Sequence, residues 1–292
     1  MMIKRLRSAG LPTVCGNGRG TLRFVASALV MLLVMIAALP ERLAAAETLE
    51  GKPDIWLVTI GGWAIIEPSF EGARDFSFGG RPILAIRREG AKDWLTLPKD
   101  SFDIELLETE RFRAGPVASW HFQRDVGSVP RGFQQVGKID LSVEAGGFIE
   151  YWPADALRTR LEVRHSIIGG KGLVADFSAD AIWRPSKAVL VTGGPRVSVA
   201  DSDFMRTYYG VDAAQASFLN LPAHSAQAGL RSYGAGSMLK YFWSDQWATM
   251  TYAEYARLSG DAGDSPLIGS HNGTKDQFTV GIGTSYTFSV GR

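Results

Sequence analysis

The sequence predicts an all-β protein: a single antiparallel up-and-down transmembrane β-barrel of about 12 strands, preceded by a cleaved signal peptide. Three observations predict this fold class. The N-terminus has the composition of an export signal, the rest of the chain alternates apolar and polar residues with a period of two, and tight turns alternate with long polar loops.

The first 46 residues predict export. Basic residues precede an apolar run from Phe24 to Leu39, whose 16 residues are fewer than the ~18–20 that a spanning helix needs. Ala44 and Ala46 supply the small side chains of a signal-peptidase site. We therefore expect residues 1–46 to be a signal peptide and residues 47–292 to form one outer-membrane barrel domain. The alternative is an uncleaved inner-membrane anchor.

The exported part of the chain excludes several functional classes. Removal of residues 1–46 takes away six of the 31 basic residues and one of the 30 acidic residues, which leaves a formal net charge of −4. A nucleic-acid-binding protein should instead have a basic surplus. Cys15 is the only cysteine and lies in the signal peptide, so no disulfide, thiolate nucleophile or cysteine metal site remains.

Twelve segments have the composition of strands: 54–66, 80–88, 93–98, 101–107, 110–124, 138–152, 156–168, 172–184, 188–201, 229–243, 246–258 and 275–288. The connections are of two kinds, tight turns (153–156, 184–187, 244–245) and long loops (67–79, 125–137, 202–228, 259–274). If each kind lies at its own rim, both chain ends lie at the tight-turn rim. Residues 93–107 then form either a hairpin turning at 98–100, which gives the favoured 12 strands, or no membrane strand, which gives 10.

The stretch LRTRLEVRHSI (157–167) has one apolar and one charged face. Alone it fits both a soluble protein with charges facing water and a membrane barrel with charges facing the lumen. The strands on either side carry acids, so three successive strands place acid, base and acid on one face, where opposite charges attract. We expect a lumen charge stripe of Asp140, Glu144, Glu150, Arg158, Arg160, Glu162, Arg164, Asp176 and Asp180. A structural ladder filling a narrow lumen is favoured over an ion-selective pore lining.

Aromatic residues lie beside the tight turns and predict a membrane-interface girdle on the apolar faces: Tyr151, Trp152, Trp183, Trp243 and Trp247. The last strand, DQFTVGIGTSYTF (276–288), places Phe278, Tyr286 and Phe288 on one apolar face. We expect this strand to close the barrel against the first strand near Trp56, since an open edge is unfavourable in lipid. The residues SVGR that follow could extend it.

No catalytic or metal site is expected. The four histidines (His121, His165, His224, His271) lack ligand spacing, and no G-x-S-x-G, H-E-x-x-H or P-loop motif occurs in the exported chain. We therefore expect no enzymatic activity and no cofactor. In the 202–228 loop, Asp203, Phe204, Met205, Tyr208 and Tyr209 could dock a protein partner, or the loop could fold onto the barrel rim. The sequence favours neither.

Several stretches resemble the MipA/OmpV family, named for the MltA-interacting protein and a vibrio outer-membrane protein: DSDFMRTYYGVDAAQA (201–216), LPAHSAQAGLRSYGAG (221–236), YARLSGDAGDSP (255–266) and the last strand. The resemblance runs from about Trp56 to Phe288. It implies an outer-membrane β-barrel. One family member is described as a scaffold that joins a lytic transglycosylase to a bifunctional murein synthase, and others as porin-like or immunogenic surface proteins.

These observations give three readings of function. The first is a non-enzymatic scaffold or structural protein in contact with outer-membrane lipid, which by the resemblance could link a lytic transglycosylase and a murein synthase. The second is a narrow porin-like channel for small solutes, which a continuous polar lumen would favour. The third is a soluble periplasmic β-protein with a binding or hydrolytic role, which a dry core and a water-facing charged face would favour.

The signal-peptide assignment is testable. We expect the protein extracted from membranes to begin at Glu47, because cleavage should follow the small residue Ala46. N-terminal sequencing or intact mass spectrometry measures this directly. An intact leader in the inner-membrane fraction would contradict both the processing and the compartment.

Overall fold

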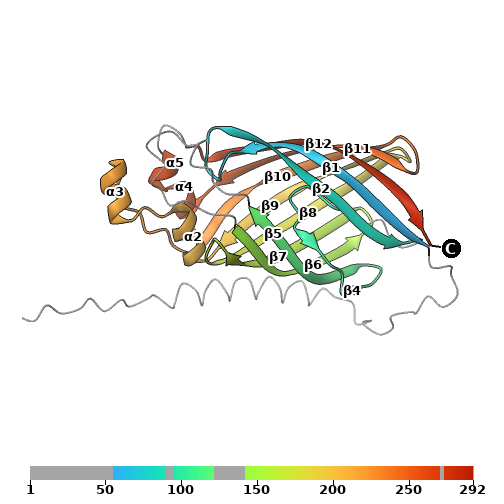
Figure 1. The fold of residues 1–292 in the computed structure, drawn as a ribbon, viewed down its shortest axis with the longest axis horizontal. Helices are drawn as coiled ribbons and strands as arrows, with labels where there is room; N and C mark the ends of the chain where they lie inside the picture. The colour runs from blue at the N-terminus through green and yellow to red at the C-terminus, as the bar shows by residue number, and fades with distance from the viewer. Residues whose placement is uncertain (1–54, 90–94, 122–141, 270–272, 292) are drawn as a thin grey trace, which may run out of the picture.

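The computed structural model describes residues 55–89, 95–121, 142–269 and 273–291, so the expected signal peptide and Asp140 lie outside the described residues. These residues form one antiparallel sheet with twelve strands (Figure 1), which confirms the predicted fold class. The long strands are β1 (Trp56–Pro68), β2 (Phe76–Arg88), β5 (Phe112–His121), β6 (Ser142–Ala154), β7 (Leu157–Ile168), β8 (Leu173–Ser186), β9 (Val189–Ala200), β10 (Gly229–Phe242), β11 (Trp247–Leu258) and β12 (Asp276–Val290). The short ones are β3 (Phe102–Asp103) and β4 (Leu107–Glu108).

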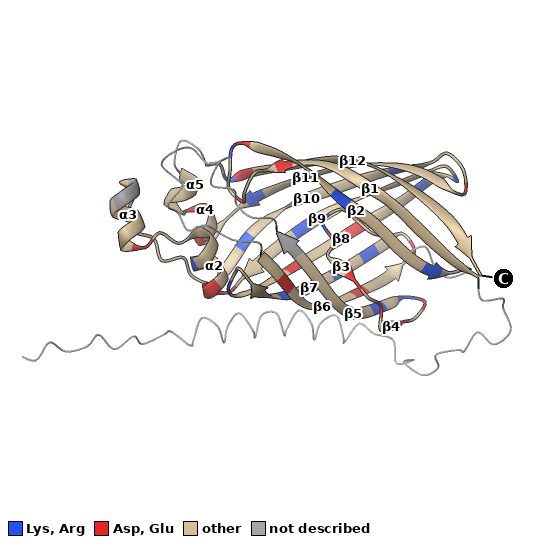
Figure 2. Ribbon diagram, in the orientation of Figure 1, with Lys and Arg blue, Asp and Glu red and all other residues tan. Residues whose placement is uncertain are grey.

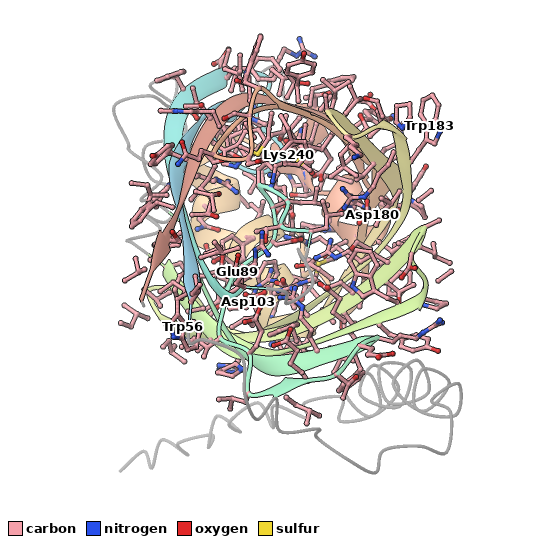
Figure 3. All side chains as sticks on the ribbon, turned by 90° about the vertical axis from the view of Figure 1, so that its right-hand side faces the viewer. Trp56, Glu89, Asp103, Asp180, Trp183 and Lys240 are labelled. Carbon is pink, nitrogen blue, oxygen red and sulfur yellow. The ribbon has the colours of Figure 1, made fainter. Side chains whose placement is uncertain are left out.

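The strands follow an up-and-down order in which each long strand from β5 to β12 pairs with the next. Viewed along the barrel, the sheet curls around an interior into which Asp103 and Asp180 point, whereas Trp56 and Trp183 point outward (Figure 3). The tight turns after β6, β8 and β10 lie at the same rim as the start of β1 and the end of β12. We call this the tight-turn rim and the opposite end the loop rim.

The last strand pairs with the first, as the sequence predicts. The β1–β12 ladder is continuous from Trp56 opposite Val290 to Ile66 opposite Val280. Ser289 and Val290 belong to β12, so the residues after Phe288 extend the strand. The expected closing residues Phe278, Tyr286 and Phe288 share the outward face, where Tyr286 and Phe288 stack with their ring centroids 6.1 Å apart.

Apolar side chains cover the outward faces. Large exposed apolar residues include Ile60, Leu84, Ile167, Leu239 and Ile282 on five different strands. Trp183, Trp243 and Trp247 are exposed beside the tight turns, as predicted for a girdle. Trp152 does not belong to this group: its side chain is buried and faces inward, where its Nε1 donates to Glu150 Oε1 at 2.8 Å. Neighbouring residues on a strand face opposite sides, so Tyr151 and Trp152 cannot both point outward.

The region of residues 95–108, here called the edge segment, corrects the predicted hairpin. The chain does turn at 98–100, where Asp100 N donates to Leu97 O. However, residues 95–98 are not a strand, because Leu95 and Leu97 turn inward and pack in the barrel interior. Residues 102–108 instead run along β5, held by β3, β4 and the bonds Ile104 N to Pro116 O and Leu106 N to Ala114 O.

The edge segment also determines how the wall ends. β3 and β4 are antiparallel to β5 and therefore run toward the tight-turn rim, as β2 does. The two ends of the sheet, β2 and β3, are thus parallel, and the pairings of the described residues include no ladder between them. The predicted strand 93–98 would have supplied an antiparallel strand between them.

Short helices cover the loop rim: α2 (Ser202–Tyr209), α3 (Ala213–Leu219), α4 (Gly260–Gly263) and α5 (Pro266–Gly269). The N-cap of α2 is Asp201, whose carboxylate accepts from Phe204 N at 2.8 Å. Residues of α2, α4 and α5 form a buried apolar cluster with Val174, Ala200 and Leu258. Within the described part of the chain, no helix has the length and apolar character to cross a membrane.

The outward face of β7 gives a test of which side meets lipid. Val163 lies mid-strand between Gly147 and Ala175 of the neighbouring strands. Val163→Arg should destabilise the barrel in bilayers by about 2–4 kcal/mol, because it places a charge near the membrane midplane. His165→Arg, on the same face nearer the loop rim, should cost only about 0–1 kcal/mol. The folded fraction by heat-modifiable gel mobility measures both, and equal effects would contradict this orientation.

Candidate functional site

The predicted charge stripe lies inside the barrel. Every second side chain of β7 faces inward, and Arg158 and Arg160 are 0% and 2% exposed. The register sets Glu150 of β6 opposite Arg160, and Asp180 of β8 opposite Arg158. Charged residues therefore occupy the buried side of these strands, whose other side is largely apolar. Figure 2 shows that blue and red positions alternate across neighbouring strands of the sheet.

Glu150 is shared by three guanidinium groups. Its Oε2 lies 3.0 Å from Arg113 Nη2, 2.9 Å from Arg158 and 3.2 Å from Arg160 Nη1. Arg113 also donates through Nε to Oε1 at 3.2 Å, and Trp152 donates to the same oxygen. Both carboxylate oxygens are thus saturated by donors, as burial of a charge requires.

Arg164 forms a second centre toward the loop rim. The register places Glu162 opposite Asp176, two like charges that would repel. Arg164 resolves this conflict because it pairs with both carboxylates and with Glu144, whose Oε2 is 3.0 Å from Arg164 Nε. The network continues from Asp176 to Arg231 of β10 at 3.2 Å.

The network extends to strands that the predicted stripe did not include. Arg231 also pairs with Glu71 of the β1–β2 connection at 2.9 Å. Arg196 of β9 pairs with Asp180 at 2.6 Å, and Asp180 lies 3.3 Å from Arg158. Ionic contacts therefore run across the inner wall from β5 to β10.

The edge segment adds acidic groups to this wall from within. Asp100 Oδ2 lies 2.7 Å from Arg158 Nη2, and Asp103 Oδ2 lies 2.7 Å from Arg160 Nη2. Glu105 pairs with Arg113, and Ser101 Oγ donates to Glu162 Oε2 at 2.6 Å. Burial alone would raise the pKa of Asp100, but the positive charges of Arg158 and Arg160 outweigh it and lower that pKa.

The interior also contains an apolar cluster, to which the strands of the charged wall contribute as well. Leu95 and Leu97 of the edge segment join an interior cluster with Trp63, Ile65, Trp152, Leu190, Met238, Met250 and Tyr252. Trp63 lies over Gly283 of β12, where an added Cβ would come within 2.7 Å of the indole ring. The edge segment thus places its leucines in the apolar cluster and its acids on the charged wall.

The candidate partner residues divide into buried and exposed groups. Phe204, Met205 and Tyr209 are buried in the loop-rim cluster, so they do not form a free docking surface. The Tyr208 hydroxyl hydrogen-bonds with Ser142 Oγ at 3.3 Å, and Asp203 is exposed and pairs with Arg206. Of the two alternatives, the helix packs onto the barrel rim, because its apolar side covers the open ends of β8 and β11.

Several residues of the network are not among those that the sequence predicts. Arg196 directly follows one Gly-Pro pair and Arg113 lies two residues before another, where the alternation is interrupted. Arg231 lies within an irregularity of the β9–β10 register. Asp100 and Asp103 lie in the region read as a hairpin. For Arg113, the signal available was its position opposite Glu150 once β5 and β6 are paired.

The described residues contain no group of three or more His, Cys, Asp or Glu arranged to hold a metal ion. The acids of the interior instead face arginines. This arrangement binds strands together and presents charge to the interior. It does not form a recognisable acid–base pair with a substrate position.

Comparisons with known proteins identify a family. Residues 60–288 match the family model described as MltA-interacting protein MipA. No curated protein matches the chain. Among solved structures, the outer membrane channel DcaP of Acinetobacter baumannii is 9% identical, with 84% of this chain and 100% of that chain covered and a TM-score of 0.37.

Two further solved structures are similar at the same low level. The NanC porin is 9% identical, covers 78% of this chain and 98% of its own, and has a TM-score of 0.35. The N-terminal β-barrel domain of Pseudomonas aeruginosa OprF is 10% identical, covers 79% and 97%, and has a TM-score of 0.23. These scores are too low to support an inference about function.

The shared carboxylate gives a stability test of the network. Glu150→Gln leaves Arg113, Arg158 and Arg160 competing for fewer buried charges and should destabilise the barrel by about 3–5 kcal/mol. Glu110→Gln, an exposed change of the same kind at the tight-turn rim, should have almost no effect. Urea unfolding of both variants in lipid measures the difference. Similar midpoints would mean that the network contributes little.

Proposed function

Because the chain belongs to the family of MltA-interacting protein MipA, we propose that it is a non-enzymatic outer-membrane barrel protein with a structural or scaffolding role. In this role it holds murein-remodelling enzymes, a lytic transglycosylase and a murein synthase, at the inner surface of the outer membrane. Its immediate surroundings are outer-membrane lipid on the apolar faces.

The packing of the interior is the observation that carries this proposal. An apolar cluster and the ionic network both lie inside the barrel, and helices α2, α4 and α5 pack over the loop rim. A general diffusion pore needs a continuous polar path, whereas barrels of about this size are readily filled by side chains. The interior therefore supports a structural role over an open pore.

The tight-turn rim is the surface that we propose for the enzymes. The start of β1, the end of β12 and the short turns lie there, as expected for the periplasmic side of an outer-membrane barrel. Arg184 near the end of β8 and Lys187 in the β8–β9 turn are exposed. They offer charge for a partner without disturbing the barrel wall.

A narrow channel is the second candidate. The observation in its favour is the charged wall, which extends over several strands from Arg113 to Arg231. A single ion pair would be enough to join two strands. A channel would use this wall to select ions. It would require the edge segment to leave a passage beside it.

Capture and conductance measured together distinguish the two functions. We expect folded protein to retain a lytic transglycosylase and a murein synthase in a pull-down, and Lys187→Glu to weaken capture. Lys171→Glu makes the same charge change at the loop rim and should have no effect. In planar bilayers we expect no steady conductance. Steady conductance without capture would overturn the scaffold and favour the channel.

A further inference from the structure

Three arginines inside the barrel have too few carboxylates of their own on the neighbouring strands. Arg113, Arg158 and Arg160 all converge on Glu150. The other strand acids in reach are shared, since Asp180 also pairs with Arg196 and Glu162 also pairs with Arg164. The strands alone therefore leave a local surplus of positive charge in a buried position.

The edge segment supplies the missing negative charge. Asp100 pairs with Arg158, Asp103 with Arg160 and Glu105 with Arg113, so each arginine receives one carboxylate from this segment. These contacts replace water or a solute that buried guanidinium groups would otherwise require. The edge segment acts here as an internal anionic ligand.

This internal ligand fits one arginine imperfectly. Arg160 Nη2 lies 2.7 Å from Asp103 Oδ2 and 2.8 Å from Glu162 Oε1, yet neither contact has hydrogen-bond geometry. The nitrogen is buried and its charge is neutralised, but its N–H groups are unsatisfied. A freely oriented carboxylate could make the paired, in-plane contacts that guanidinium favours.

The backbone of the edge segment is paired on one side only, although its side chains make further contacts. Its wall part pairs with β5, and among the described pairings none joins it to β2. Its contact with β2 is made by a side chain, where Arg81 Nη1 donates to Pro98 O at 2.6 Å. The centre is not sealed either, because the side chains of Asp103 and Glu105 remain 21% and 32% exposed.

We propose that Arg113, Arg158 and Arg160 form a binding centre for a small polycarboxylate, which the carboxylates of the edge segment occupy in the resting protein. A soluble polycarboxylate competes with Asp100 and Asp103 for the same guanidinium groups. This binding activity is separate from scaffolding, which uses the tight-turn rim, so either can fail without the other.

The resident carboxylates give the direct test, with citrate as the probe. Isothermal titration of detergent-folded protein compares wild type with the Asp100→Asn/Asp103→Asn double variant. Removing the internal competitors should lower the Kd for citrate about tenfold or more, because charged hydrogen bonds replace the lost ones. Glu110→Gln, outside the network, should leave the Kd unchanged, and acetate at equal ionic strength should not bind. A folded double variant that binds citrate no better than wild type would overturn the proposal.

A second measurement does not depend on the double variant folding. The exported chain has no cysteine, so Leu97→Cys places one thiol on the edge segment at a buried position, and Asp245→Cys places one in an exposed turn. Citrate should accelerate labelling of the thiol at 97 by a maleimide and leave labelling at 245 unchanged, relative to sodium chloride of equal ionic strength. No citrate-dependent change at 97 would show that the segment is not displaced.

Discussion

The fold depends on the pairing of charges that are withdrawn from water. Arg158 and Arg160 face the interior because the other side of β7 is apolar, and at that depth each needs a carboxylate within reach. Glu150 and Asp180 provide it from the two neighbouring strands. A slip of one residue in either ladder would turn these charges toward lipid and the apolar residues inward. The ionic contacts therefore fix the register as well as stabilising it.

The direction of the strands limits how the wall can end. The long strands alternate in direction without interruption from β5 round to β2, so the two ends of this series would meet as an antiparallel pair. The edge segment adds one further descending strand beside β5 and removes that match. The part of this segment that precedes the turn at 98–100 lies in the interior and not in the wall. There Leu95 and Leu97 pack in the apolar cluster. The edge segment thus determines both how the wall ends and part of what packs inside the barrel.

Most of the fold and part of the site could be predicted from the sequence, and the reasons differ by element. A period of two identifies which residues share a face, so the stripe on β6, β7 and β8 and the outward Phe278 follow directly. The same period does not say whether a segment stays in the wall, and for this reason it predicts a wall strand at 93–98. Long-range partners such as Asp100 for Arg158 depend on tertiary packing, which local alternation does not encode. The apolar character of Phe204 and Met205 likewise fits both burial against the barrel and contact with a partner. Only the position of the loop over the rim shows that they are buried.

The ladder between β1 and β12 has a consequence for how the protein is made. Thr59 and Thr287, whose hydroxyl groups are 2.8 Å apart, are separated by 228 positions in the sequence. Contacts between such distant residues form slowly, because the intervening chain must first be ordered. Strand β1 is synthesised first and yet cannot complete its pairing with β12 until the last strand has been made. Until then β1 presents an unsatisfied edge, and an exposed edge favours pairing with other chains.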